Sequence, residues 1–404
     1  MPPFEPFSHY LAYGATDQET LRELRDMYSG ILVPATIAAF QRQGTGGFVL
    51  SLSATEESPP YMIDSRFPLF QQRLKAPKKS HTALAELLDD SGLVATGVAP
   101  TPEDFPDDRV VTVARRWVDF NTGYGQQESD NFDKYAKRLG QDVRPDQAKL
   151  PEAVLAPYFA CEDSEDPWWE RSQRFFDATS AAATELPCLR VVCALTGSGL
   201  DDLLGTVNDP ERLVVWVSDL DEHNTTASEL LDYRRAVENA VSRGHEPFAL
   251  YGGFFSVLLG SAGLCGASHG IGFSEHRSWL ELPESGAPPA RYYLRRAHRY
   301  VSQDLAQVFF NIASEITECS CPHCDGRPPI ALDYHELMKH SVWCRDEEIR
   351  VWFKTDLGSA ADALQSEFED LTNQVSTARL VPTIRTRALG ALQHLPEWVT
   401  ALKS

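Results

Sequence analysis

The sequence lacks the features that place a protein in a membrane or export it. Its N-terminus, Met1-Pro2-Pro3-Phe4-Glu5, has no basic stretch followed by an apolar one, as a secretory signal requires. No apolar run approaches the roughly 20 residues that span a bilayer. We therefore expect a cytoplasmic protein with no membrane partner.

Two other common signatures are also missing. No glycine-rich dinucleotide fingerprint or P-loop connects a strand to a helix; the stretch Gly44-Thr45-Gly46-Gly47 precedes an apolar run and is interpreted as a loop. No disulfide framework is indicated, because five of the eight cysteines are scattered in apolar or helical contexts: Cys161, Cys188, Cys193, Cys265 and Cys344. The composition, 43% hydrophobic, is that of an ordinary soluble enzyme with a large core.

Positive charge is scarce as well. The chain has 37 Lys and Arg against 58 Asp and Glu, a net charge of −21, which argues against broad attraction to phosphate backbones. One basic stretch with interleaved Tyr and His stands apart, and it contains Arg291, Arg295, Arg296 and Arg299. We expect these arginines to contact nucleic acid, with a solvated helix face that pairs with nearby acids as the alternative.

A dense cysteine cluster is the most specific feature of the chain. Cys319, Cys321 and Cys324 lie within six residues, and a predicted helix that follows carries His335, His340 and Cys344. Thiolate sulfurs and an imidazole nitrogen suit tetrahedral zinc, and Pro322 and Gly326 favour the tight turn that brings the sulfurs together. The spacing predicts a metal site, and a chance cluster of free or structural cysteines is the alternative.

Short apolar runs alternate with amphipathic segments along most of the chain. The predicted strands are 48–53, 61–63, 92–95, 154–160, 189–194, 213–217, 247–251 and 270–273, and predicted helices include 82–88, 168–183 and 227–242. Alternating strands and helices favour a parallel sheet, and about eight strands fit a (β/α)8 TIM-like barrel over residues 1–290. A doubly wound open sheet is the alternative.

The organisation changes after residue 290. A Pro- and Gly-rich loop is predicted at 282–289, and helices are predicted at 295–316, 359–374 and 383–392. We interpret residues 291–404 as a zinc-binding helical C-terminal region packed on the barrel.

Several predicted strand ends carry groups that suit catalysis or binding. Barrel active sites gather where strands end at the carboxyl face. Asp64 follows the second predicted strand and Glu275 the eighth, so we predict that these two carboxylates face one pocket and divide the catalytic work. A helix cap or an Arg-paired structural role is the alternative for each. The residues predicted to bind substrate are Ser65, Gly252, Gly253, His276 and Arg277.

These motifs resemble the tRNA-guanine transglycosylase family, including its relatives that insert 7-deazaguanine bases into DNA. The family's C-x-C-x-x-C zinc motif matches Cys319, Cys321 and Cys324, and His340 is similar to its completing ligand. The family's Asp-Ser-Gly-Gly-Phe-Gln signature is only partly matched, because residues 66–69 replace its glycines. Its nucleophilic aspartate falls at Glu275, and the spacing from Cys324 to His340 is shorter than usual.

The resemblance implies a structural zinc held by the three cysteines and His340, and an exchange of a guanine-type base in tRNA or DNA. Glu275 would attack the sugar carbon, Asp64 would handle protons or hold the base, and the incoming purine or 7-deazapurine base would displace the enzyme. A homodimer is compatible with these expectations. Two alternatives stay open: a non-catalytic zinc-containing barrel that binds nucleic acid or a regulatory ligand, and a nucleoside or sugar hydrolase.

Overall fold

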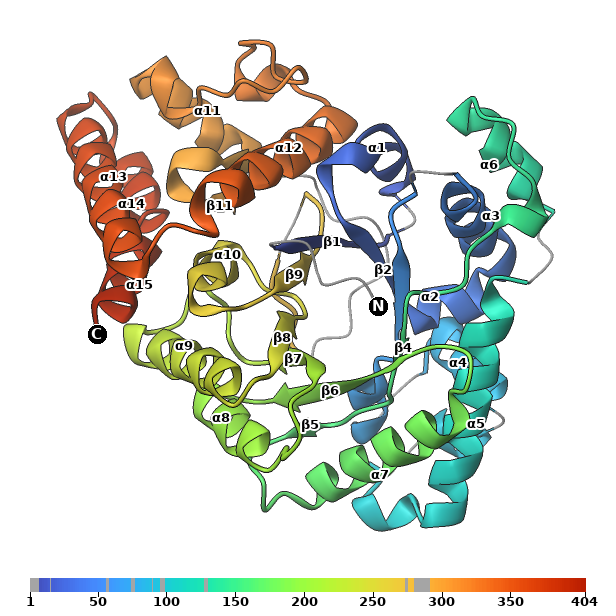
Figure 1. Cartoon of the computed structure of the whole chain (residues 1–404). Helices are drawn as coiled ribbons and strands as arrows, with labels where there is room; N and C mark the ends of the chain where they lie inside the picture. Colours follow the sequence, from blue (N-terminus) through green and yellow to red (C-terminus); the bar gives the residue numbers. More distant parts are fainter. Residues whose placement is uncertain are drawn as a thin grey trace.

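The core of the protein is a closed parallel barrel wrapped by helices (Figure 1). The computed structural model describes residues 7–404 except 15, 56–57, 74–76, 89, 95–98, 127–129, 273–274 and 280–290. Its strands are β1 Ser8–Ala12, β2 Gly30–Pro34, β3 Tyr61–Asp64, β4 Val154–Leu155, β5 Ala160–Cys161, β6 Cys188–Ala194, β7 Arg212–Val217, β8 Glu246–Ala249 and β9 Gly266–His269.

The ring closes because β1 pairs with β9 and β4 pairs with β6, in addition to the pairings of neighbouring strands. Every one of these pairings is parallel. β4 and β5 both pair with β6, one after the other along its length, so they share one of the eight strand positions. The fold class predicted from the sequence is confirmed.

Helices follow most of the barrel strands. They are α1 Gln18–Glu23, α2 Ala35–Phe40, α3 Arg42–Ser53, α4 Lys79–Leu87, α5 Asp107–Tyr124, α6 Phe132–Leu139, α7 Pro167–Ala182, α8 Gly197–Gly205, α9 Ala227–Ser242 and α10 Phe254–Leu258. Successive side chains of a strand point alternately into the barrel and out toward the helices. Tyr10 and Ala12 belong to the cluster that fills the barrel, whereas Leu11 packs outward among residues of the helices. This alternation is expected for barrel strands covered by helices.

The C-terminal region is mostly helical and covers one side of the carboxyl end of the barrel. It contains the hairpin β10 Tyr292–Leu294 and β11 Arg299–Val301, followed by α11 Gln303–Ile312, α12 Tyr334–Trp352, α13 Leu357–Thr377, α14 Pro382–Gly390 and α15 His394–Lys403. α15 lies against α9, where Arg234 donates hydrogen bonds to two carbonyls of α15, those of Ala401 at 3.0 Å and Leu402 at 3.1 Å. Trp398 donates to the carbonyl of Glu222 at 2.6 Å.

Four predicted strands coincide closely with β3, β6, β7 and β8. The strand predicted at 48–53 is wrong, because this stretch and the glycine-rich segment 44–47 form helix α3. Most of α3 is buried, and a short apolar run does not distinguish a buried helix from a strand. β1 and β2 were missed for a related reason, since all their residues are buried and no polar alternation marks them.

Other boundaries also differ. The segment 91–94 forms a 3-10 turn in place of a strand, and the eighth barrel strand ends at His269, before the predicted 270–273. The predicted strand 154–160 is split into β4 and β5. The segment predicted as one helix at 295–316 consists of a 3-10 turn, the hairpin strand β11, helix α11 and a second 3-10 turn. The loop predicted at 282–289 lies outside the described residues.

A buried histidine links the β10–β11 hairpin to two helices of the C-terminal region. His298, at the turn of the β10–β11 hairpin, contacts Glu348 of α12 at 2.7 Å and Glu367 of α13 at 3.0 Å. Its ring stacks on Phe254 of α10 with a centroid distance of 3.8 Å. Burial lowers the pKa of His298, but the hydrogen bonds to the two glutamates outweigh burial and raise that pKa to about 9.

This histidine predicts a pH-dependent contribution to stability. Because the pKa is raised above the unfolded value, the stabilisation is fully present below about pH 6.5 and is lost as the pH rises through about 9. The free energy of unfolding of His298→Gln should therefore be lower than that of the wild type at pH 7, and the difference should shrink by pH 10. Urea denaturation at both pH values measures this, with the half-buried His335→Gln as a control. An equal difference at both pH values would contradict the assignment.

Candidate functional site

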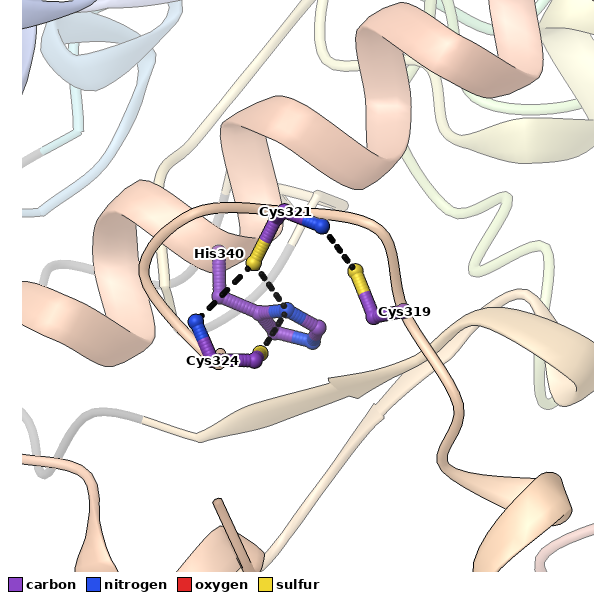
Figure 2. Close-up of side chains that lie close together, drawn as sticks. All are labelled: Cys319, Cys321, Cys324 and His340. Atoms are coloured by element: carbon purple, nitrogen blue, oxygen red, sulfur yellow. Dashed lines mark hydrogen bonds between the residues drawn. The ribbon is translucent and has the colours of Figure 1, made fainter. Parts of the chain in front are cut away.

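The predicted metal ligands come together at one point of the C-terminal region. Cys319, Cys321 and Cys324 lie on a loop that curls over the imidazole of His340 from α12 (Figure 2). The four ligand atoms lie within 4.8 Å of one another, and three of the four residues are buried. His340 Nδ1 is 3.5 Å from the sulfur of Cys321 and 2.9 Å from that of Cys324. This group could hold a metal ion.

The surroundings orient these groups as metal ligands require. His340 Nε2 is 2.8 Å from the carbonyl of Tyr293, which only accepts, so the proton lies on Nε2 and the lone pair of Nδ1 faces the sulfurs. The backbone N–H groups of Cys321 and Cys324 donate to the sulfurs of Cys319 at 3.3 Å and Cys321 at 3.2 Å, which stabilises thiolates. Tetrahedral zinc would separate its donors by about 3.5 Å, so the donor set fits.

The two other candidate ligands behave differently. Cys344 lies one turn beyond His340, with its sulfur 3.7 Å from that of Cys319, but it is not part of the four-residue group. His335 is not part of the group either, and its Nε2 is 3.9 Å from a carboxylate oxygen of Glu19. The four residues predicted as ligands are the ones whose ligand atoms lie within 4.8 Å of one another, and the Cys344 sulfur lies next to this group, 3.6 Å from His340 Nδ1.

A second cluster surrounds Asp64 at the mouth of the barrel. Asp64 ends β3 and is fully buried. Its carboxylate accepts hydrogen bonds from the hydroxyls of Tyr158 at 2.8 Å and Tyr251 at 2.5 Å, and from the backbone of Arg66 at 3.1 Å. Tyr158 lies in the interruption between β4 and β5, and Tyr251 follows β8. Side chains from three strand ends thus converge on one carboxylate, as in a barrel active site.

Two guanidinium groups lie above the same cluster. Arg66 and Arg277 are 5.8 Å and 5.2 Å from the ring centroid of Tyr251. Arg66 Nε is also 3.6 Å from Asp64. Arg66 and Tyr251 have φ angles of 55° and 57°, which are uncommon for residues other than glycine and gather at functional sites. Ser65 beside them is buried, and its hydroxyl has no hydrogen-bond partner among the described residues.

Glu275 belongs to a different set of contacts. One of its oxygens forms a buried ion pair with Arg345 of α12, and the other has no hydrogen-bond partner within the described part of the chain. Arg345 also donates to the hydroxyl of Tyr293 at 2.9 Å and lies 3.5 Å from Glu348. Burial raises the pKa of Glu275; the charge of Arg345 opposes this, but Glu222 and Glu348 add to it, and the pKa reaches about 8.

The two glycines predicted to bind substrate are tightly packed. A Cβ on Gly253 would lie 2.5 Å from carboxylate oxygens of both Glu222 and Glu275, and one on Gly252 would lie 2.4 Å from the hydroxyl of Ser256. Glu222 accepts from the backbone N–H of Gly253 and Phe255 at 2.8 Å, at the start of α10. Close packing alone therefore requires glycine here, and a role of Gly252 and Gly253 in substrate binding stays a prediction.

The expected pairing of the two carboxylates also stays a prediction. Among the residues that the structure describes, no hydrogen bond or ion pair joins Asp64 to Glu275, and each has its own partners. His276, half-buried next to Glu275, and Arg277 lie on the segment that follows β9. The sequence analysis did not identify four residues that contact these carboxylates: Tyr158, Arg66, Tyr251 and Arg345. Most of them lie far along the chain from the carboxylate that they contact.

An open groove of about 670 Å³ lies along the β10–β11 hairpin, and neither Asp64 nor Glu275 lines it. It is bounded by the β7–α9 loop, the β10–β11 hairpin and helices α14 and α15, and three arginines line it: Arg291, Arg299 and Arg387. Because a loop that follows a barrel strand forms part of its wall, the groove opens at the carboxyl end of the barrel. Arg295 and Arg296 do not line the groove, and Arg296 pairs with Asp370 at 2.7 Å. The hairpin thus separates the four predicted arginines.

Comparison with known proteins adds little to this geometry. No family model matches the chain, and no curated protein sequence is significantly similar to it. The crystal structure of nitroalkane oxidase from Streptomyces ansochromogenes is similar at 14% identity, over 86% of this chain and 88% of that one, with a TM-score of 0.27. A likeness this weak carries no argument about fold or activity. In the described part of the chain, no helix is long and apolar enough to span a membrane.

The ligand geometry predicts one bound metal ion per chain, detectable by elemental analysis of the purified protein. Cys324→Ser should lose the metal and unfold at lower urea concentration, because a closed tetrahedral site folds together with its ion. Cys344→Ala removes a neighbouring thiol of similar burial and should keep the metal. Loss of the ion from Cys344→Ala, or a wild type that is folded and metal-free, would contradict the ligand set.

Proposed function

We propose that the protein is a base-exchanging transglycosylase, a pentosyltransferase that replaces a guanine-type base in tRNA or DNA. The observation that carries the proposal is the position of Asp64 and Glu275 at the carboxyl end of a (β/α)8 barrel that also bears a C-terminal Cys3His group. This combination is the one that the sequence resemblance implied.

The proposed metal is zinc, held by Cys319, Cys321, Cys324 and His340. Three sulfurs and one nitrogen suit zinc, and four protein donors leave no open position for water or substrate. The ion would therefore be structural. Its effect on the site would pass through α12, the helix that carries both His340 and Arg345.

In the proposed reaction, a carboxylate oxygen of Glu275 attacks the sugar carbon while the bond to the outgoing base breaks, and the base leaves with the bonding electron pair. A glycosyl ester of Glu275 results. The incoming base then attacks the same carbon and releases the carboxylate. Asp64 would hold or protonate the base at the barrel mouth, where the hydroxyls of Tyr158 and Tyr251 fix its orientation.

The groove lined by Arg291, Arg299 and Arg387 supports a polynucleotide as the substrate. An enzyme that extrudes one nucleotide grips the phosphates around it, and guanidinium groups bind phosphates well. Burial lowers the pKa of Arg299, but the group remains a cation, and its Nε has no hydrogen-bond partner among the described residues. With a net charge of −21, the protein would attract nucleic acid only at such a local basic site.

A second candidate is a binding protein without catalysis. This candidate is favoured because both carboxylates already have partners in the protein. Asp64 accepts hydrogen bonds from two tyrosine hydroxyls, and Glu275 is paired with Arg345. Such a protein would bind tRNA or DNA without exchanging a base. A nucleoside or sugar hydrolase, in contrast, would turn over a free nucleoside without nucleic acid.

The proposal predicts incorporation of labelled guanine or a 7-deazaguanine into tRNA or duplex DNA. Because Glu275 must be ionised to attack and its pKa is raised to about 8, the exchange rate should rise with pH up to about 8 and then level off. Glu275→Gln should lower the rate at least about 100-fold.

Glu275→Asp, which keeps the charge but withdraws it by one methylene, is the matched control and should retain part of the activity. Thermal denaturation of each variant shows whether its fold is intact. A rate that falls as the pH passes 8 would make Glu275 an acid catalyst in place of a nucleophile. An unchanged rate in a folded Glu275→Gln would remove Glu275 from the mechanism.

A further inference from the structure

The backbone around Arg277 is held by hydrogen bonds, whereas its guanidinium has no hydrogen-bond or ion-pair partner among the described residues. The carbonyl of Arg277 accepts from the indole of Trp216 at 3.2 Å. Two residues on, Trp279 accepts from Gln72 at 2.6 Å and donates from its backbone to Ser218 at 2.8 Å. Among the residues that the structure describes, the guanidinium of Arg277 makes no hydrogen bond or ion pair; it only lies over the ring of Tyr251.

Arg66 completes a pair of cations over that ring. Its Nη2 donates to the hydroxyl of Tyr251 at 3.3 Å, and its Nε makes no hydrogen bond within the described chain. Among the described residues, Asp64 is the one carboxylate in ion-pair contact with this pair, and it contacts Arg66 only. The charge of Asp17 also favours the charged form of Arg277, but no ion pair joins the two within the described part of the chain. Counted over the described residues, the contacts of the two guanidiniums therefore supply one carboxylate for two positive charges.

The two cations also repel each other. Burial, and next the charge of Arg66, lower the pKa of Arg277 to about 10. A pair of like charges held together by a rigid frame is costly unless an anion binds between or beside them. Tyr158, Trp216 and Tyr251 are aromatic residues of the core that fills the barrel. Arg66 and Arg277 therefore lie at the barrel mouth, where barrel ligands bind.

We infer that Arg66 and Arg277 form a phosphate-binding subsite at the mouth of the barrel. The N–H groups of a guanidinium can bind two oxygens of a phosphate at once. A planar carboxylate is satisfied by one guanidinium. Two guanidiniums from separate loops therefore suit a tetrahedral anion better. The identification of the bound molecule rests on the proposed function: the phosphate would be the one attached to the nucleotide whose base is exchanged. The groove arginines would then hold phosphates of its neighbours.

Calorimetric titration with inorganic phosphate tests the subsite without any assumption about the base. The wild type, Arg277→Gln, Arg291→Gln and the exposed Arg144→Gln are compared at constant ionic strength, with acetate as the carboxylate probe. We expect Arg277→Gln to weaken phosphate binding by about 10- to 100-fold, as for loss of a charge-assisted hydrogen bond. Arg144→Gln should bind as the wild type does, and acetate should bind more weakly than phosphate.

Three outcomes would overturn the inference: no phosphate binding by the wild type, loss of binding in Arg291→Gln but not in Arg277→Gln, or acetate bound as tightly as phosphate. The second would assign the anion to the groove, and the third would make the subsite a carboxylate site. Failure of the proposed function is separate. If no base is exchanged but Arg277→Gln still loses phosphate, the transglycosylase proposal fails and the subsite stands.

Discussion

Arg345 is the buried charge on which the arrangement of the site depends. Its guanidinium, 1% exposed, holds Glu275 on one side and lies against Tyr293 and Glu348 on the other. A buried guanidinium requires such partners, because removing a charge from water is costly unless counter-charges and hydrogen bonds replace the solvent. Arg345 lies five residues after His340 on α12, so the helix that would be fixed by the metal also positions the proposed nucleophile.

The carboxyl end of the barrel is thereby divided into two environments. Around Asp64, tyrosine hydroxyls and Arg66 come from barrel loops alone. Glu275 is paired with Arg345, which belongs to the C-terminal region. Gly253 is closely packed between Glu275 and Glu222. A change in the position of α12 would move Glu275 without moving Asp64. In the proposed reaction, this coupling would give the C-terminal region a direct influence on the position of Glu275, beyond the stability that its packing provides.

Local patterns in the sequence predicted some parts of this structure well. The cysteine spacing is a local property, so Cys319, Cys321 and Cys324 could be assigned without knowledge of the fold, and apolar β-branched runs located β6 and β7. Buried segments could not be assigned in this way: all residues of β1 are buried, and the short apolar run in α3 does not distinguish a buried helix from a strand. Partners distant in sequence were equally invisible: Arg345 is 70 residues from Glu275, and Tyr251 is 187 from Asp64.

The most direct test of the account is a search for the covalent intermediate. The protein is incubated with tRNA or duplex DNA in the absence of an incoming base, digested, and analysed by mass spectrometry. Double displacement predicts release of a guanine-type base and a glycosyl adduct on the peptide that contains Glu275, absent from Glu275→Gln. Binding of the polynucleotide with neither base release nor adduct would contradict the account and leave a binding protein built on a catalytic fold.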